Sequence, residues 1–144
     1  MDNTTTKKKI LIVDDETGLA LLYKQRLETE GFAVAYCDNG EAALQTAREF
    51  RPDLILLDLM MPRLSGFDAI DLFHNTLETS GALIVVLSAL SQPDDIAKAK
   101  SIGADDYIVK SDASIDEVVA RIKKVVYKVS QDYVPASNDP SPAN

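Results

Sequence analysis

Several polar side chains in this sequence come directly after short apolar runs, at points where the chain would leave a strand. They are three acids after the first run, one acid after the third, a hydroxyl after the fourth and a lysine after the fifth: Asp14, Asp15, Glu16, Asp58, Ser88 and Lys110. Carboxylates gathered in one place are electrostatically costly unless a cation neutralises them. These residue types could therefore bind a metal ion and, beside it, an anionic group.

The chemistry that such a set could perform is phosphoryl transfer to a carboxylate. Hard carboxylate oxygens suit Mg²⁺, which keeps several waters and accepts a phosphate oxygen. A carboxylate can attack phosphorus and form an aspartyl phosphate. The three equatorial oxygens of the phosphoryl group then need partners, which the metal ion, a lysine ammonium and a hydroxyl with backbone N–H groups can supply. The sequence provides the last two side chains as Lys110 and Ser88.

The elements that must position these residues alternate between strands and helices. Helical spacing of apolar residues follows each apolar run; the first helix carries Leu19, Leu22, Tyr23 and Leu27 and ends at Gly31. Asn39 is predicted to cap the second helix. The predicted strands lie at residues 10–13, 32–36, 54–57, 83–87 and 107–109, and the third to fifth helices at about 67–73, 93–102 and 115–126.

Strands that are apolar on both faces and separated by helices predict a parallel sheet covered on both sides. Right-handed crossovers make a doubly wound α/β sheet the natural architecture. In such a sheet the ligand site lies beyond the carboxyl ends of the strands. The polar residues at the strand ends are therefore expected to meet at one edge of the sheet. The second strand contributes no comparable residue, as expected if it lies at the sheet edge.

Composition limits the possible functions. The chain has 144 residues, of which 46% are hydrophobic and 26% charged, and this fits one globular domain. Its net charge of −8 argues against direct binding of nucleic acid. No apolar run approaches the roughly 20 residues that span a bilayer, so we expect no membrane insertion. The single Cys37 agrees with a reducing compartment, and we expect a cytoplasmic location.

The domain boundaries follow from where the periodic pattern starts and stops. We expect residues 1–8 to be an N-terminal extension and residues 9–128 to form the domain. The last residues are rich in Ser, Pro, Asn and Asp and have little to bury, so residues 129–144 are expected to be a flexible tail.

Each polar residue also has an ordinary explanation when taken alone. Acids favour helix N-termini, so Asp14, Asp15 and Glu16 could simply precede a helix. Asp58 could be a turn residue. A lone lysine such as Lys110 is most often solvated. The coincidence of all of them at successive strand ends favours a site.

Together, the segments that carry these residues resemble the receiver domain of bacterial response regulators, over about residues 9–128. The matching segments are Ile-Val-Asp-Asp-Glu at 12–16, Asp-Leu-Met-Met-Pro at 58–62 with Gly66, Leu-Ser-Ala at 87–89 and Gly-Ala-Asp-Asp-Tyr-Ile-Val-Lys at 103–110.

The resemblance implies a role for each matching position. Asp58 would be the phosphoacceptor and also a metal ligand, and the rotamer of Tyr107 would follow Ser88 in the switch. The remaining implied roles are direct Mg²⁺ ligand for Asp15, water-mediated ligand for Asp14, ligand through its backbone carbonyl for Met60, and phosphoryl contacts for Ser88 and Lys110.

The resemblance also implies a fold, partners and an output. The fold would be flavodoxin-like (βα)₅ with strand order 2-1-3-4-5. The protein would be a switch in a two-component phosphorelay, with at most self-catalysed phosphotransfer and autodephosphorylation. Its phosphodonor would be a histidine kinase or a His-containing phosphotransfer protein. Phosphorylation would change the surface of the fourth helix, fifth strand and fifth helix, where a homodimer could form and where Asp106 and Arg121 resemble residues that pair across such a dimer.

The sequence departs from this family after Lys110. The family usually has proline there, often after a cis bond, whereas this chain has Ser111 and a stretch to Glu117 that is one residue longer. A non-proline cis bond costs about 2.5–4 kcal/mol, so we expect a trans Lys110–Ser111 bond and a rebuilt loop.

Two other classes of protein share some of these features. A phosphatase with an aspartate nucleophile usually needs a second Asp two positions after the nucleophile, where this chain has Met60. A flavodoxin-like cofactor binder needs a phosphate-binding loop after the first strand, where the acids would repel phosphate. His74 and Cys37 are interpreted as structural, because no ligand-spaced partner accompanies His74 and nothing near Cys37 suggests reactivity.

Overall fold

The computed structural model describes residues 7–61 and 65–127. Pro62 and the predicted flexible tail, residues 129–144, lie outside the described residues. In chain order the elements are β1 (Lys9–Val13), α1 (Thr17–Thr29), β2 (Ala33–Cys37), α2 (Gly40–Phe50), β3 (Leu54–Leu57), α3 (Gly66–His74), β4 (Leu83–Ser88), α4 (Pro93–Ser101), β5 (Asp106–Val109), the 3₁₀ turn η1 (Lys110–Asp112) and α5 (Ile115–Val126).

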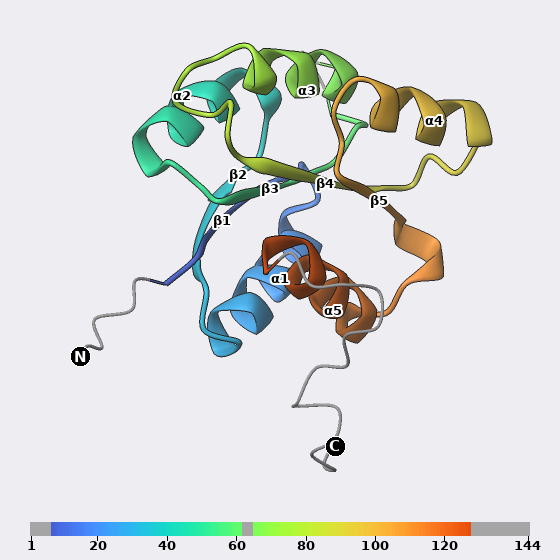
Figure 1. Cartoon of the computed structure of the whole chain (residues 1–144). Coiled ribbons are helices and arrows are strands. Elements are labelled where there is room, and N and C mark those ends of the chain that lie inside the picture. The colour runs from blue at the N-terminus through green and yellow to red at the C-terminus, as the bar shows by residue number, and fades with distance from the viewer. Residues whose placement is uncertain (1–6, 62–64, 128–144) are drawn as a thin grey trace.

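The five strands form one parallel sheet in the order β2-β1-β3-β4-β5. Helices α2, α3 and α4 cover one face of this sheet, and α1 and α5 cover the other (Figure 1). The predicted doubly wound, flavodoxin-like (βα)₅ fold with strand order 2-1-3-4-5 is therefore confirmed.

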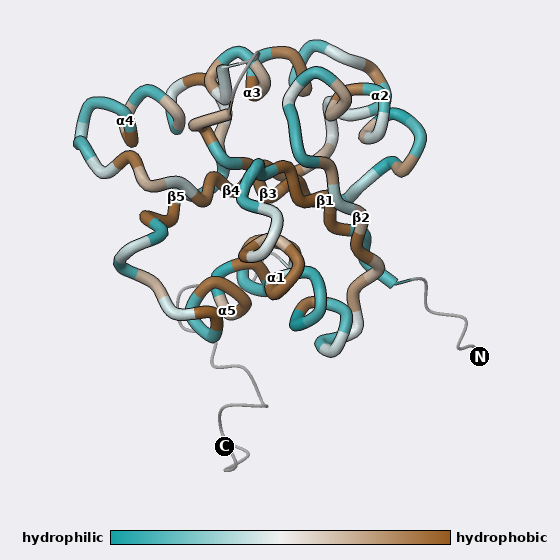
Figure 2. The backbone as a smooth tube through the Cα atoms, turned by 180° about the vertical axis from the view of Figure 1, so that it is seen from behind, coloured by the Kyte–Doolittle hydropathy of each residue, from teal (hydrophilic) through white to brown (hydrophobic). Residues whose placement is uncertain are grey.

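Successive strand residues point to opposite faces, so each face of the sheet has its own core. In β1, Leu11 and Val13 pack on the α2–α3–α4 side, whereas Ile10 and Ile12 pack on the α1–α5 side. All four residues of β3 are buried as well. Figure 2 shows this as hydrophobic colouring along the central strands. The two cores hold the strand ends in fixed register, which matters for the site at those ends.

Polar side chains cap the starts of α2 and α5, and the first of these caps was predicted from the sequence. The side chain of Asn39 accepts a hydrogen bond from the Ala42 N–H at 2.8 Å, which confirms the predicted cap of α2. Ser114 and Glu117 form a reciprocal capping box at the start of α5. Such caps satisfy N–H groups that have no partner inside the helix.

One detail of the fold differs from the expectation and another agrees with it. Leu22 is 52% exposed, because the buried stripe of α1 is formed by Ala20, Tyr23 and Leu27. No peptide bond among the described residues is cis, so the Lys110–Ser111 bond is trans as predicted. The rebuilt loop is the short turn η1, which precedes the Ser114 cap.

Replacing Gly66 with alanine is expected to destabilise the protein. A Cβ at this position would lie 2.3 Å from the Cα of Leu59, so the backbone beside Asp58 would have to move. Overpacking of this kind costs about 1–3 kcal/mol. The free energy of unfolding from urea denaturation measures the effect. Gly18→Ala is the control, since nothing lies within 4 Å of a Cβ there; equal stabilities of the two variants would contradict the prediction.

Candidate functional site

The candidate site lies at the edge of the sheet where the parallel strands end. Asp14 follows β1, Asp58 follows β3, and Ser88 is the last residue of β4. A backbone hydrogen bond joins the ends of β1 and β3: the Asp58 N–H donates to the Val13 carbonyl at 2.9 Å. Asp14, Asp58 and Ser88 are all buried. The sheet therefore brings together residues that are far apart in the sequence, as predicted.

Lys110 supplies the positive charge of the site. Its ammonium lies 3.0 Å from Asp14 Oδ2 and 3.4 Å from Asp58 Oδ2, and it is hydrogen-bonded to Glu16. Burial disfavours the charged form of Lys110, but the Glu16, Asp14 and Asp58 carboxylates outweigh burial and raise the pKa of the ammonium. Lys110 is therefore charged throughout the physiological pH range.

Asp14 is the carboxylate that burial affects most clearly. Burial raises its pKa, and the nearby Asp58 charge adds to the shift. The Glu16 N–H, which donates to Asp14 Oδ1 at 2.9 Å, and the Lys110 ammonium oppose it. One ammonium thus leaves the pKa of Asp14 above its ordinary value, so a further positive charge at this edge would stabilise the ionised form.

The carboxylate oxygens suit a hard divalent cation. Oxygens of Asp14, Glu16 and Asp58 all lie within 4.8 Å of one another. Carboxylate oxygens are the type of donor that Mg²⁺ prefers, so these three side chains are suited to hold it. Among the described residues, the third member of this group is Glu16, whereas the sequence had suggested Asp15. Asp15 is exposed, and its role as a direct ligand stays a prediction.

Asp58 is held by its own loop as well as by Lys110. Its Oδ1 accepts a hydrogen bond from the Met60 N–H at 3.0 Å, while its Oδ2 faces Lys110. The carboxylate therefore has a fixed orientation at the end of the central strand. Met60 itself is half exposed, and the part of its carbonyl as a metal ligand stays a prediction.

Ser88 and Tyr107 meet at the backbone of Leu90. The Leu90 N–H donates to Ser88 Oγ at 3.2 Å, and the Tyr107 hydroxyl donates to the Leu90 carbonyl at 2.8 Å. Tyr107 is buried, and burial raises the pKa of its hydroxyl. The ring of Tyr107 therefore lies inward and is linked to Ser88 through the backbone of Leu90.

Tyr36 is a contributor that the sequence did not reveal. Its hydroxyl lies 2.9 Å from the Asp14 carbonyl, to which it donates, and 3.1 Å from Thr17 Oγ1. It therefore fixes the loop that carries Asp14, Asp15 and Glu16. An aromatic residue near the end of an edge strand has an ordinary structural explanation, so the sequence gave no reason to choose it.

His74 and Cys37 make contacts that agree with structural roles. His74 Nε2 lies 2.9 Å from the Gly103 carbonyl, and the buried Cys37 thiol donates to the Asn39 carbonyl at 3.2 Å.

Within residues 7–61 and 65–127, no helix is both long enough and apolar enough to cross a membrane.

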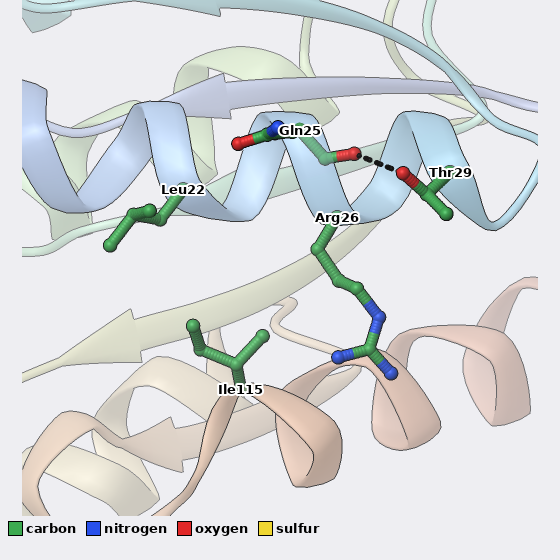
Figure 3. Close-up of a pocket in the computed structure, with 5 residues that line it drawn as sticks. All are labelled: Leu22, Gln25, Arg26, Thr29 and Ile115. Atoms are coloured by element: carbon green, nitrogen blue, oxygen red, sulfur yellow. Dashed lines mark hydrogen bonds between the residues drawn. The ribbon is translucent and has the colours of Figure 1, made fainter.

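An open groove lies between α1 and α5, and none of the residues that line it is Asp14, Glu16, Asp58 or Lys110 (Figure 3). Arg26 reaches across it and pairs with Asp116 of α5 at 2.6 Å. Arg26 is the one ionisable side chain among the described residues that line the groove, so the candidate site is placed at the acidic edge of the sheet. The groove is lined by Leu22, Gln25, Arg26, Thr29 and Ile115.

Known proteins match both the sequence and the fold. The family model described as response regulator receiver domain matches residues 10–123. The DNA-binding response regulator MtrA of Mycobacterium tuberculosis is 40% identical over 119 residues, which are 83% of this chain and 50% of the relative. The transcriptional regulatory protein ResD of Bacillus subtilis is 37% identical over 137 residues, 95% of this chain and 55% of the relative.

Solved structures agree. The signal receiver domain of a Luxo repressor protein from Vibrio parahaemolyticus has a TM-score of 0.78 with 27% identity, covering 85% of this chain and 92% of that chain. A CheY-like receiver domain protein from Methanospirillum hungatei also has a TM-score of 0.78, with 25% identity, covering 85% and 96%.

This chain spans about half the length of the curated relatives it matches. The name of MtrA describes a DNA-binding protein, and that property belongs to the relative. Our expectation that this chain makes no direct contact with nucleic acid therefore stays a prediction. The phosphatase alternative finds no support in these matches. The chain belongs to the response regulator receiver domains, the phosphoacceptor modules of two-component signalling.

Proposed function

We propose that Asp58 is the phosphoacceptor and that its phosphodonor is the phosphohistidine of a histidine kinase or of a His-containing phosphotransfer protein. The observation that supports this assignment is the position of Asp58. Its buried carboxylate lies at the end of the central strand, is oriented by the Met60 N–H, and faces the Lys110 ammonium.

In the transfer, a carboxylate oxygen of Asp58 forms a bond to phosphorus while the bond between phosphorus and the donor nitrogen breaks. The electron pair of the broken bond stays on the departing imidazole. Lys110 and Ser88 then contact two of the phosphoryl oxygens, and their positions are set before the reaction by the strands that carry them.

Mg²⁺ would be held by Asp14, Asp15, Asp58 and the Met60 carbonyl, and would neutralise charge on the phosphoryl group. The support for this is the group of hard oxygen donors around Asp14 and Asp58. In this proposal the site residues accept and orient the phosphoryl group, and no turnover of a separate substrate is required of them. We therefore propose a switch with at most self-catalysed phosphotransfer and autodephosphorylation.

We propose that the phosphorylated site acts through Ser88 and Tyr107 on the surface of α4, β5 and α5, which could also carry a homodimer. In this structure Arg121 pairs with Asp106 of its own chain, at 2.6 and 2.8 Å. Pairing across a dimer would therefore have to break or share this ion pair. The proposed receiver unit is residues 9–128, acting in the cytoplasm.

Replacing Asp58 with asparagine should abolish phosphorylation, because an amide oxygen cannot replace the carboxylate nucleophile. Intact-mass spectrometry after incubation with acetyl phosphate and Mg²⁺ measures the added phosphoryl group. Asp38→Asn is the control, since it removes an exposed acid that follows β2 and should be labelled like the wild type. A phosphoryl group retained by Asp58→Asn would refute the assignment.

Replacing Tyr36 with phenylalanine should weaken Mg²⁺ binding. The change removes the hydrogen bond to the Asp14 carbonyl but keeps the ring. One hydrogen bond contributes about 0.5–1.5 kcal/mol, so the dissociation constant for Mg²⁺ should rise about two- to tenfold. Calorimetric titration measures it. Tyr127→Phe, whose ring stacks on Phe32, is the control; unchanged affinity in Tyr36→Phe would show that the loop does not need this bond.

A further inference from the structure

The ammonium of Lys110 faces three carboxylates, and this limits how it can receive a phosphoryl group. Its partners are Glu16, Asp14 Oδ2 at 3.0 Å and Asp58 Oδ2 at 3.4 Å, so the contact with Asp58 is the longest. An ammonium has three N–H donors. Phosphorylation removes the charge of the Asp58 carboxylate and adds charged phosphoryl oxygens beyond it, so the ammonium is drawn toward those oxygens and away from Asp14 and Glu16.

The exposure of the two other carboxylates indicates which contact is given up. The side chain of Asp14 is 4% exposed, whereas that of Glu16 is 58% exposed. A buried carboxylate that loses its cation has little water to replace it. An exposed carboxylate regains water, and its ion pair is worth little. Glu16 is therefore the partner that Lys110 gives up most easily.

The local structure of Glu16 suits such a movement. Glu16 is the N-cap residue of α1, but its side chain makes no capping hydrogen bond. Its backbone N–H is fixed on Asp14 Oδ1 at 2.9 Å, while its side chain extends to Lys110. The backbone is thus anchored at the site, and the charged end of the side chain is free to turn into water.

We propose that Glu16 is a positioning residue that holds Lys110 in the unphosphorylated protein and releases it when Asp58 is phosphorylated. This inference rests on the proposed function of Asp58 and Lys110. A contact made before phosphorylation and lost afterwards stabilises only the unphosphorylated state. Glu16 therefore lowers the phosphorylated population without touching the phosphoryl group.

The test compares Glu16→Gln with the wild type in binding of beryllofluoride, a phosphoryl analogue that needs no transfer reaction. At saturating Mg²⁺, ¹⁹F NMR titration should give about two- to fivefold tighter binding in Glu16→Gln, the range expected for loss of an exposed ion pair. Without beryllofluoride, the Lys110 side-chain resonances should already differ from those of the wild type, because the ammonium has lost its Glu16 partner.

The matched control is Asp38→Asn, which also removes one negative charge after a strand of this sheet. Asp38 accepts from Asn39 Nδ2 at 2.9 Å and belongs to none of the Lys110 ion pairs. This variant should bind beryllofluoride like the wild type. Equal tightening in both variants would assign the effect to net charge and overturn the proposal.

Two further results separate this inference from the function on which it rests. If Glu16→Gln does not bind beryllofluoride more tightly and its affinity for Mg²⁺ falls about tenfold or more, a ligand role replaces the holding role. If Glu16→Gln binds no more tightly while its Mg²⁺ affinity is unchanged, the proposal is equally wrong, but the function of Asp58 stands. A wild type that fails to bind beryllofluoride would refute both.

Discussion

Repulsion between carboxylates at one edge of the sheet is the interaction on which the site depends. A parallel sheet places the carboxyl ends of its strands together, so Asp14 and Asp58 cannot move apart without breaking the register of β1 and β3. Both side chains are buried, and burial raises the pKa of Asp14. Lys110 offsets this cost only in part, because one ammonium faces three carboxylates. The site is thus built with an excess of negative charge that a cation can neutralise.

The two cores keep this unfavourable arrangement rigid. Residues of β1 and β3 are buried on both faces of the sheet, so the strand ends cannot relax without exposing apolar side chains on one side or the other. Side chains in the loops after the strands are more exposed, as Glu16 and Met60 show. Rigid strands with adjustable loop side chains allow charges to be rearranged while the acceptor stays in place.

The sequence predicted what periodicity and chain order determine. The strands, the Asn39 cap and the meeting of Asp14, Asp58 and Lys110 follow from apolar patterns and from parallel topology. The direction in which a loop side chain points does not follow from such patterns. Glu16 reaches Lys110, 94 positions away, and Tyr36 reaches the Asp14 carbonyl from a neighbouring strand. Leu22 shows the same limit, because which face of a short helix is buried depends on how it packs against its neighbours.

The site and the proposed output surface share β5, and this gives a local charge change a route to the outside of the molecule. Tyr107 lies in β5 and Lys110 directly follows this strand, so a change of partners at Lys110 would act on the strand that carries the proposed switch residue. The ring of Tyr107 lies inward, and its hydroxyl donates to the carbonyl of Leu90, whose N–H donates to Ser88 Oγ. A movement of Ser88 would therefore reach Tyr107 through Leu90, and phosphorylation would act by shifting the population of ring positions. A switch of this kind requires a few favourable contacts at Asp58 and no rebuilding of the fold.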